Sequence, residues 1–259
     1  SNGNVLLAEG VQLTPYMITT LRRIGVEMIY IRDELFDDVE IVDPVSEENK
    51  RFVMKQMGEL YQSLRSGKAF NPRSVSVSVD ALLDDLTKNK DVLLQLNDIR
   101  TEDNRQYIHA LNVCIISVMI GLNMDLSPQQ LKDLAIGALL HDVGKVGLDP
   151  SVKEDTGRMH HTWRGFEILK KDFSLMSAHV ALQHHEQPNG HGVPRGLTSD
   201  QIHLFAKIVS AANIYDNLLY NEETGKRMMP HEACEQMMAM SGTKLDREVL
   251  IHFTRTVSS

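Results

Sequence analysis

The chain has 259 residues, 42% hydrophobic and 24% charged, which is typical of a globular protein and allows one large domain or a medium domain with a smaller partner. Its formal net charge of −8 lacks the basic excess of a general nucleic-acid binder, so we expect no DNA or RNA polymer as partner. An anionic small substrate remains compatible with this charge if lysines, arginines or bound metal ions supply local positive charge.

Apolar runs and cysteines indicate the cellular compartment of the protein. No apolar run reaches the ~18–20 residues that span a bilayer, and the start "SNGNVLLAEG" lacks the basic and apolar regions of a signal peptide. Cys114 and Cys234 are the only cysteines, and the apolar run "VCIISVMIGL" around Cys114 favours a core residue over a disulfide partner. We therefore predict a cytoplasmic protein without a membrane span.

The N-terminal segment has the pattern of a small α+β module. "NVLLAEGVQLT" and "VEMIYIRD" have the pattern of short strands. Between them "TPYMITTLRRIG" has helical spacing, with Thr14 as N-cap, Pro15 at the first position and Gly25 as C-cap. We assign residues 1–44 to this module and expect any homodimer or protein partner to bind through it.

Two amphipathic helices follow and form a predicted helical linker over residues 45–90. Apolar residues from Phe52 to Leu64 recur near helical spacing, and a second helix is predicted from about Val75 to Lys88. The apolar stripes of these helices suit a dimer contact or packing on the chain's own domain, and the sequence leaves both open.

From Asp91 onward the sequence shows almost no strand signal, which predicts a mainly α domain over residues 91–259. Ser127 and Pro128 supply one helix with a cap and a first-position proline. The Gly- and Pro-rich stretch 186–199 must form a loop. The predicted helices cover 91–99, 103–122, 127–140, 160–170, 174–185, 200–220, 230–240 and 245–256. The predicted fold class is therefore mainly α, a helical bundle preceded by the small α+β module and the linker.

The stretch "LLHDVGKVGLD" carries the first chemical signal. His141 and Asp142 stand side by side at the end of an apolar run, and Lys145 follows between two glycines. Alone, the His-Asp pair fits a buried polar pair, a nucleotide contact or two ligands of a metal site.

Other histidines stand where helices meet loops and favour the third interpretation. His109 lies inside a helix, His160 and His161 begin one, and His184 and His185 end another. Imidazole and carboxylate are ligands of Fe, Mn and Zn. One aspartate can bridge two metals, an arrangement that hydrolyses phosphate esters.

A single histidine on a helix is usually structural, whereas doublets at helix ends are harder to explain in that way. Burying so many polar rings without partners would cost several kcal/mol. We expect structural roles for His179, His203, His231 and His252, and we prefer His161 to its neighbour His160 as the functional residue of that pair.

Four blocks in order carry a resemblance to a known family. "HDVGKVGLD", "HTWRGFEIL", "HHEQPNGHGVPRGL" and "FAKIVSAANIYDNL" resemble the HD-GYP branch of the HD phosphohydrolases, over about residues 100–256. The N-terminal segment is similar to the module that precedes such domains in many bacterial proteins.

The resemblance implies an HD-domain helical bundle that hydrolyses cyclic di-GMP to pGpG or GMP in bacterial second-messenger signalling. It implies two divalent metal ions, Fe or Mn, with Asp142 as the bridging catalytic carboxylate and Lys145 as a phosphate contact. The metal ligands that it implies are His109, His141, Asp142, His161, His184, His185 and Asn213. The substrate loop that it implies is Gly192, Val193, Pro194 and Arg195.

Several positions depart from the family pattern. Val193 replaces the loop tyrosine, and Asn213 stands where the family has a metal-ligating aspartate, with Asp216 one turn later able to orient a ligand. Arg105 replaces the glutamate of three-metal members, so a third metal is not expected. The phosphate-binding Arg-Pro-Tyr-Lys block is not intact. These departures leave two alternatives open: a degenerate domain that signals by contact with little hydrolysis, and an HD phosphohydrolase for another nucleotide.

Overall fold

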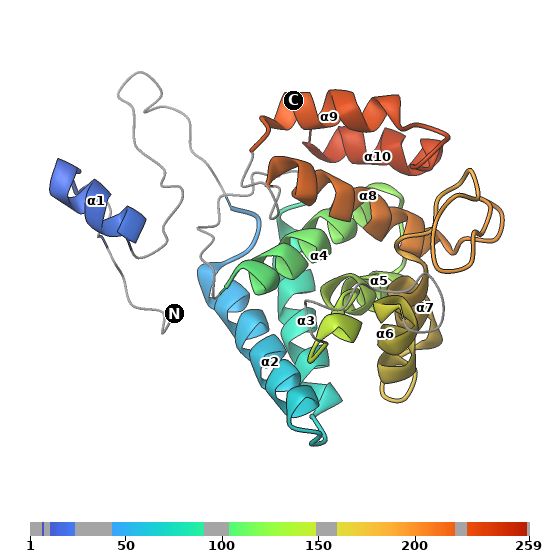
Figure 1. Cartoon of the computed structure of the whole chain (residues 1–259), viewed down its shortest axis with the longest axis horizontal. Coiled ribbons are helices and arrows are strands. Elements are labelled where there is room, and N and C mark those ends of the chain that lie inside the picture. The colour runs from blue at the N-terminus through green and yellow to red at the C-terminus, as the bar shows by residue number, and fades with distance from the viewer. Residues whose placement is uncertain are drawn as a thin grey trace.

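The computed structural model describes residues 7, 11–23, 43–90, 104–148, 160–220 and 227–257. These residues form α-helices, one short 3-10 helix and isolated β-bridges, with no sheet among them, which confirms the mainly α fold class (Figure 1). The elements are α1 (Pro15–Arg23), α2 (Glu47–Arg65), α3 (Pro72–Lys88), α4 (Arg105–Asn123), α5 (Pro128–Leu139), η2 (Val143–Lys145), α6 (His161–Leu169), α7 (Leu175–Gln183), α8 (Leu204–Leu219), α9 (Pro230–Ala239) and α10 (Arg247–Val257).

Capping residues fix the starts of several helices, as the sequence predicts. In α5 the Ser127 side chain accepts from the Gln130 backbone N–H while the Gln130 side chain accepts from the Ser127 N–H, a full capping box. In α1 the Thr14 hydroxyl accepts from the Met17 N–H at 3.3 Å. Both helices therefore begin at the proline that follows the cap.

One predicted start was wrong by a turn. The helix predicted over 200–220 begins at Leu204, because the residues before it form turns and His203 is its N-cap. The Thr198 backbone N–H donates to the Gln201 side chain at 3.1 Å, and the His203 N–H donates to the Gln183 side chain at 2.8 Å. These bonds satisfy backbone groups that a longer helix would use.

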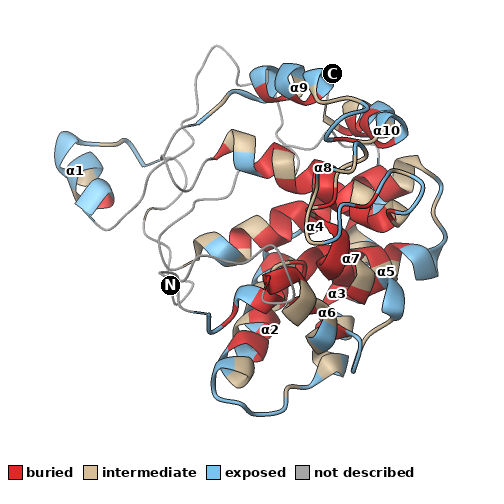
Figure 2. Ribbon diagram, turned by 45° about the vertical axis from the view of Figure 1, so that its right-hand side comes forward, coloured by how far each residue is buried: buried red, intermediate tan, exposed pale blue. Residues whose placement is uncertain are grey.

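The helix α4 forms the centre of the molecule. It packs against α2, α3, α5, α8 and α10, and Figure 2 shows buried residues along most of its length. By length and composition it could cross a membrane, but 78% of its most apolar part is buried inside the protein. That burial is typical of a core helix. Cys114 lies within it, fully buried and reduced, as predicted.

The apolar faces of α2 and α3 are covered by the chain itself. Val53 and Met57 of α2 and Val79 and Leu82 of α3 belong to the same buried core as α4 and α5. The start of α2 is also tied to the last turn of α3, since the Asp85 carboxylate accepts from the Ser46 hydroxyl at 2.8 Å. These faces therefore pack on the chain's own domain, which is one of the two alternatives that the sequence leaves open.

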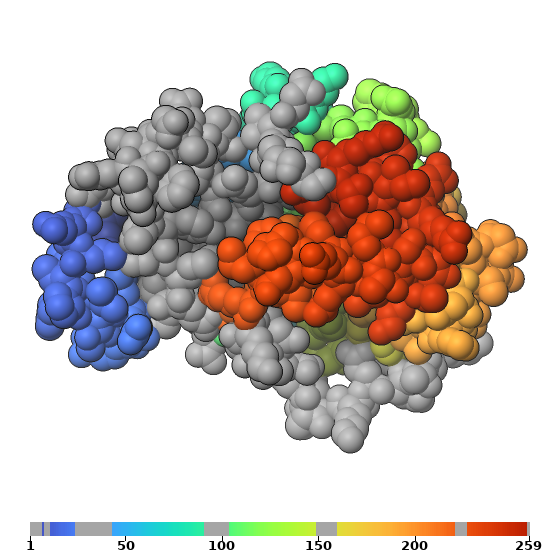
Figure 3. Space-filling view, turned by 90° about the horizontal axis from the view of Figure 1, so that it is seen from above, coloured from blue at the N-terminus to red at the C-terminus, as the bar shows by residue number. Residues whose placement is uncertain are grey.

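The C-terminal helices hold the Gly/Pro-rich loop. Figure 3 shows α9 and α10 side by side on one face, with the loop beside them. The Asn189 N–H donates to the Thr243 carbonyl at 3.1 Å, and the Ser199 hydroxyl donates to the Asp246 carboxylate at 3.3 Å. The predicted loop over 186–199 is confirmed, since no helix forms there.

Some predictions fall outside the described residues. They include the strand "VEMIYIRD", Gly25, the helix over 91–99 and most of the first strand, whose described end at 11–14 is irregular. The α+β module and the domain boundaries at 44 and 90 stay predictions.

Candidate metal centre

The ends of several helices converge on one buried cluster. His109 lies on α4, His141 and Asp142 stand between α5 and η2, and His161 is the first residue of α6. His184 and His185 directly follow α7. These are the six residues implied as ligands by the resemblance, apart from Asn213, and the structure brings them together.

The six side chains form two overlapping groups. In one, ligand atoms of Asp142, His161, His184 and His185 all lie within 4.8 Å of one another. In the other, ligand atoms of His109, His141 and Asp142 lie within the same distance. Asp142 belongs to both groups. A carboxylate has two oxygens, so this sharing is the geometry that a bridging ligand needs.

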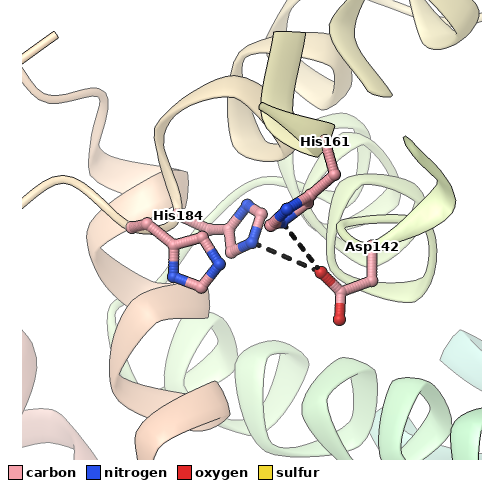
Figure 4. A group of neighbouring side chains, drawn as sticks. Asp142, His161 and His184 are labelled. Carbon is pink, nitrogen blue, oxygen red and sulfur yellow. Dashed lines mark ion pairs between the residues drawn. The ribbon is translucent and has the colours of Figure 1, made fainter. Parts of the chain in front are cut away.

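Hydrogen bonds to backbone carbonyls orient two of the imidazoles around Asp142. His141 Nδ1 lies 2.7 Å from the Ala138 carbonyl oxygen, and His184 Nδ1 lies 3.0 Å from that of Ala181. A carbonyl can only accept, so each Nδ1 carries the proton and each Nε2 presents a lone pair. The Nε2 atoms of His161 and His184 lie 3.3 and 3.6 Å from the same Asp142 oxygen (Figure 4).

The cluster fits a divalent cation. Nε2 of His141, Nε2 of His184 and Oδ1 of Asp142 are buried and have no hydrogen-bond partner in the part of the chain that the structure describes. Buried acceptors that face one another without a donor are costly. A cation among them would remove that cost, and imidazole with carboxylate is a donor set for transition metals.

Burial also keeps these groups in the protonation state that metal binding requires. It lowers the pKa of His141 to about 3, and it lowers the pKa of His184 and His185 too, so these rings are neutral at pH 7. Burial alone would raise the pKa of Asp142, but its interactions with His141, Lys145, His161 and His184 hold the pKa well below its usual value. Neutral imidazole and ionised carboxylate are the ligating forms.

His109 is oriented from α8. Its Nδ1 lies 2.6 Å from Oδ2 of Asp216, whose side chain is fully buried. Asp216 also accepts from the side-chain amide of Asn112 at 3.0 Å. The role predicted for Asp216, orienting a ligand, agrees with this contact. Asn112 was not predicted, because an asparagine inside an apolar helix carries no signal of its own.

Lys145 contacts the shared carboxylate directly. Its Nζ lies 2.8 Å from Oδ2 of Asp142, and about half of its side chain is exposed. The ammonium therefore stands at the mouth of the cluster, within reach of a bound anion. The turn that places it depends on Gly144, where an added Cβ would lie 1.9 Å from the His161 carbonyl oxygen.

A cavity of about 260 Å³ adjoins the cluster at the predicted substrate loop. Its lining is rich in imidazole and includes two of the predicted loop residues: His160, His185, Gln187, His191, Gly192 and Val193. Gly192 must be glycine, because an added Cβ would lie 2.3 Å from the Gln187 backbone nitrogen. Pro194 and Arg195 follow these residues in the loop.

Two residues near this cavity were not predicted to be part of the site. Glu186 is almost fully buried, and its carboxylate accepts from the backbone N–H groups of Arg195 and Leu197 at 2.8 and 2.9 Å. It therefore shapes the loop from within. His160, which was passed over in favour of His161, caps α6 by accepting from the Thr162 backbone N–H, and its ring also lines the cavity.

Asn213 lies on α8, three residues before Asp216. Its side-chain oxygen accepts from the Asn217 side chain at 2.9 Å, and the residue is buried. The bond uses one of the two lone pairs of that oxygen. Coordination by Asn213 stays a prediction.

A helical scaffold with an adjacent His-Asp pair at its centre and further histidines from neighbouring helix ends is the arrangement of an HD domain. A family model described as "HD domain" matches residues 90–249, well over half of the chain. The chain belongs to this HD-domain family, as the ordered motif blocks predicted.

Named relatives extend the comparison. The chain is 25% identical over 209 residues to "Cyclic di-GMP phosphodiesterase PA4108" of Pseudomonas aeruginosa, covering 76% of this chain and 50% of the relative. It is 28% identical over 177 residues to a "Cyclic di-GMP phosphodiesterase" of Thermotoga maritima, covering 64% and 48%. It is 31% identical over 121 residues to "3'3'-cGAMP-specific phosphodiesterase 3" of Vibrio cholerae, covering 42% and 26%. The chain thus spans about half or less of the length of these relatives.

A solved structure supports the fold. "Bd1817, a HDG"Y"P protein from Bdellovibrio bacteriovorus" superimposes with a TM-score of 0.64 at 20% identity, covering 79% of this chain and 69% of that one. At this identity the similarity concerns the fold alone.

Proposed function

We propose that the chain is a metal-dependent phosphodiesterase that hydrolyses cyclic di-GMP to pGpG or GMP in bacterial second-messenger signalling. The observation that carries the proposal is the position of Asp142, which belongs to two ligand groups at once. Relatives named as phosphodiesterases of cyclic di-GMP and 3'3'-cGAMP support the substrate class. The reaction is attack of water on phosphorus, with the ribose 3′ oxygen leaving.

Two divalent cations fit the cluster, and Fe or Mn suits a set of imidazoles and one carboxylate. His161, His184 and His185 would hold one with Asp142, and His109 and His141 would hold the other with it. Such cations supply Lewis acidity and lower the pKa of bound water. A ligand set with a single carboxylate and neutral rings leaves most of that positive charge available to a phosphodiester.

The remaining residues bind and orient the substrate. Lys145, at the mouth of the cluster, would place its ammonium against a nonbridging phosphate oxygen, where charge builds up as the P–O bond breaks. The cavity beside Gly192 and Val193 would take part of the nucleotide, because it opens next to His185. Arg195 follows in the same loop and is the nearest cation in sequence to contact a phosphate.

The test is turnover with defined metal content. Purified protein loaded with Mn²⁺ or Fe²⁺ should linearise cyclic di-GMP, and Asp142→Ala should abolish turnover and bind less metal. Asp84→Ala, which removes an exposed carboxylate paired with Lys88, is the matched control and should keep full activity. A protein with two metals per chain that turns over no cyclic dinucleotide would refute the proposal.

The substrate is tested by product analysis across several nucleotides. Cyclic di-GMP, 3'3'-cGAMP and a cyclic mononucleotide should be offered at equal concentration. Preference for cyclic di-GMP supports the proposal. Preference for 3'3'-cGAMP would make that cyclic dinucleotide, for which another relative is named, the substrate instead.

A second function is favoured by Asn213. A neutral carboxamide whose oxygen already accepts from Asn217 is a weaker ligand for a hard cation than a carboxylate. A domain weakened in this way would bind metal or nucleotide and signal by protein contact. Calorimetry that finds tight cyclic di-GMP binding without products would favour this function over catalysis.

A further inference from the structure

A hydrogen-bonded chain of three side chains joins α4 to α8 beside the cluster. Asn112 donates from its amide nitrogen to Oδ1 of Asp216 at 3.0 Å, and Oδ2 of Asp216 lies 2.6 Å from Nδ1 of His109. All three are shielded from solvent: Asp216 is 0% exposed, Asn112 1% and the His109 side chain 12%. Because His109 and Asn112 are three residues apart on one helix, both face the same carboxylate.

The chemistry of the three groups sets the direction of the bonds. A carboxylate is an acceptor, so the proton between Asp216 and His109 is placed on Nδ1 of the ring. His109 then has only Nε2 left to offer, and its ring lies edge-on to that of His141 with centroids 5.4 Å apart. Asn112 holds the carboxylate by its other oxygen, so neither Asp216 nor His109 can turn without breaking a buried bond.

The His109 half of the cluster carries little negative charge of its own. The group of His109, His141 and Asp142 has one carboxylate, and that carboxylate is shared with the other group. On α8 Asp216 is the only acidic residue, and Asn213, three residues earlier, is neutral. A carboxylate that accepts from a ligating imidazole makes the ring a stronger donor and stabilises a cation bound to it.

We propose, on the basis of the proposed function, that Asp216 is a positioning residue for the His109 half of the metal centre. Held by Asn112, it fixes the orientation of His109 and supplies through that ring the negative charge that Asn213 does not bring. The cation held by His109, His141 and Asp142 therefore depends on Asp216, and the cation held by His161, His184 and His185 does not.

The test is a metal titration that does not depend on turnover. Metal-free full-length protein is titrated with Mn²⁺ by calorimetry, and metal content is measured after dialysis. The wild-type protein should bind two equivalents. In Asp216→Asn one equivalent should weaken by about 10–100-fold, while the other keeps its wild-type affinity.

Two further variants separate this role from a purely structural one. Asp246→Asn removes another largely buried carboxylate, which pairs with Lys207 at 2.9 Å, and should leave both equivalents unchanged. Asn112→Asp combined with Asp216→Asn exchanges the amide and the carboxylate. It keeps a hydrogen bond between the two positions and moves the charge away from His109. The double variant should be more thermally stable than Asp216→Asn, but its weakened Mn²⁺ site should have the same low affinity as in Asp216→Asn.

The outcomes are distinguishable. If both equivalents in Asp216→Asn match the wild type, or both weaken equally in a protein that is still folded by circular dichroism, the inference about Asp216 is wrong and the proposed function stands. If the exchanged variant regains full affinity, the charge supplied through His109 is not needed, and that overturns the inference as stated. If the wild type binds no Mn²⁺, the proposed function fails and the inference fails with it.

Discussion

Gly144 offers the sharpest test of how the backbone builds the site. It lies in the η2 turn between Asp142 and Lys145, pressed against the first turn of α6. A Cβ added to Gly144 would lie 1.9 Å from the His161 carbonyl oxygen and 2.7 Å from the Gly165 backbone nitrogen. Both are backbone atoms, so no side-chain rotation can relieve the contact. We expect Gly144→Ala to force η2 and α6 apart.

The size of the effect follows from these distances. Ordinary contact begins near 3.4 Å, so the Gly144 turn and the His161 carbonyl must separate by about 1.5 Å, the difference between 3.4 and 1.9. Overpacking of a core costs typically about 1–3 kcal/mol, and because only backbone can yield we expect about 3 kcal/mol. A loss of that size should lower Tm by roughly 6–12 °C in a protein of this length. The same shift should move His161 away from Asp142 and weaken metal binding.

The assay combines urea denaturation with Mn²⁺ titration. Gly58→Ala is the matched control, because an added Cβ at this α2 position meets nothing within 4 Å. A helix-interior glycine replaced by alanine should gain about 0.5–1 kcal/mol, so the two variants should move in opposite directions. If Gly144→Ala unfolds within about 0.5 kcal/mol of the wild type, the range of an ordinary surface change, the close approach of η2 and α6 does not exist in solution.

Three further predictions concern pH, capping and the lysine. The pKa of buried His141 is about 3 in the folded chain against 6.5 when exposed, so the unfolded chain binds more protons between these values. Metal-free protein should therefore lose stability as pH falls below 6.5, and this residue should account for about 2 kcal/mol of the loss at pH 5. Urea denaturation measures the effect, and an unfolding free energy that stays constant from pH 7 to 5 would contradict it. Ser127→Ala should cost about 1 kcal/mol in the same assay by removing the α5 capping box, with no change in Mn²⁺ affinity. Lys145→Met should lower kcat for cyclic di-GMP by about 10²–10³-fold, as loss of one charge-stabilising donor does, at unchanged metal stoichiometry; an unchanged kcat would remove Lys145 from the phosphate site.

Features with local causes could be predicted from the sequence. The helix that starts at Pro128 was predicted because its cap, its first-position proline and its apolar spacing lie within a few residues of one another. The positions of His141, Asp142 and the histidine doublets were predicted for a similar reason. The His141-Asp142 and His184-His185 pairs each close a helix before a glycine-rich loop, and helix ends are where side chains can leave the bundle's regular packing.

Features that depend on distant partners could not be predicted in this way. Asn112 reads as one polar residue in an apolar helix, and its role appears only when Asp216, 104 residues away, is brought beside it. Glu186 likewise reads as a loop carboxylate, yet the fold turns it inward to accept from the backbone of Arg195 and Leu197. In both cases the contact exists only in the folded chain, with a carboxylate 104 residues away for Asn112 and with backbone N–H groups for Glu186.

The electrostatics of the cluster bear on how an acidic chain could bind an anionic substrate. The whole chain carries −8, which opposes the approach of a dinucleotide with two phosphates. At the site, however, Asp142 is the single carboxylate of both ligand groups, its charge is matched by Lys145, and burial keeps His141 and His184 neutral. The two ligand groups are therefore close to neutral, the buried Asp216 carboxylate adds one negative charge behind His109, and two divalent cations would still leave the site positive. A site rich in carboxylates would cancel that charge. On this argument the predominance of imidazole in the ligand set is what allows bound metal to attract the substrate as well as to activate it.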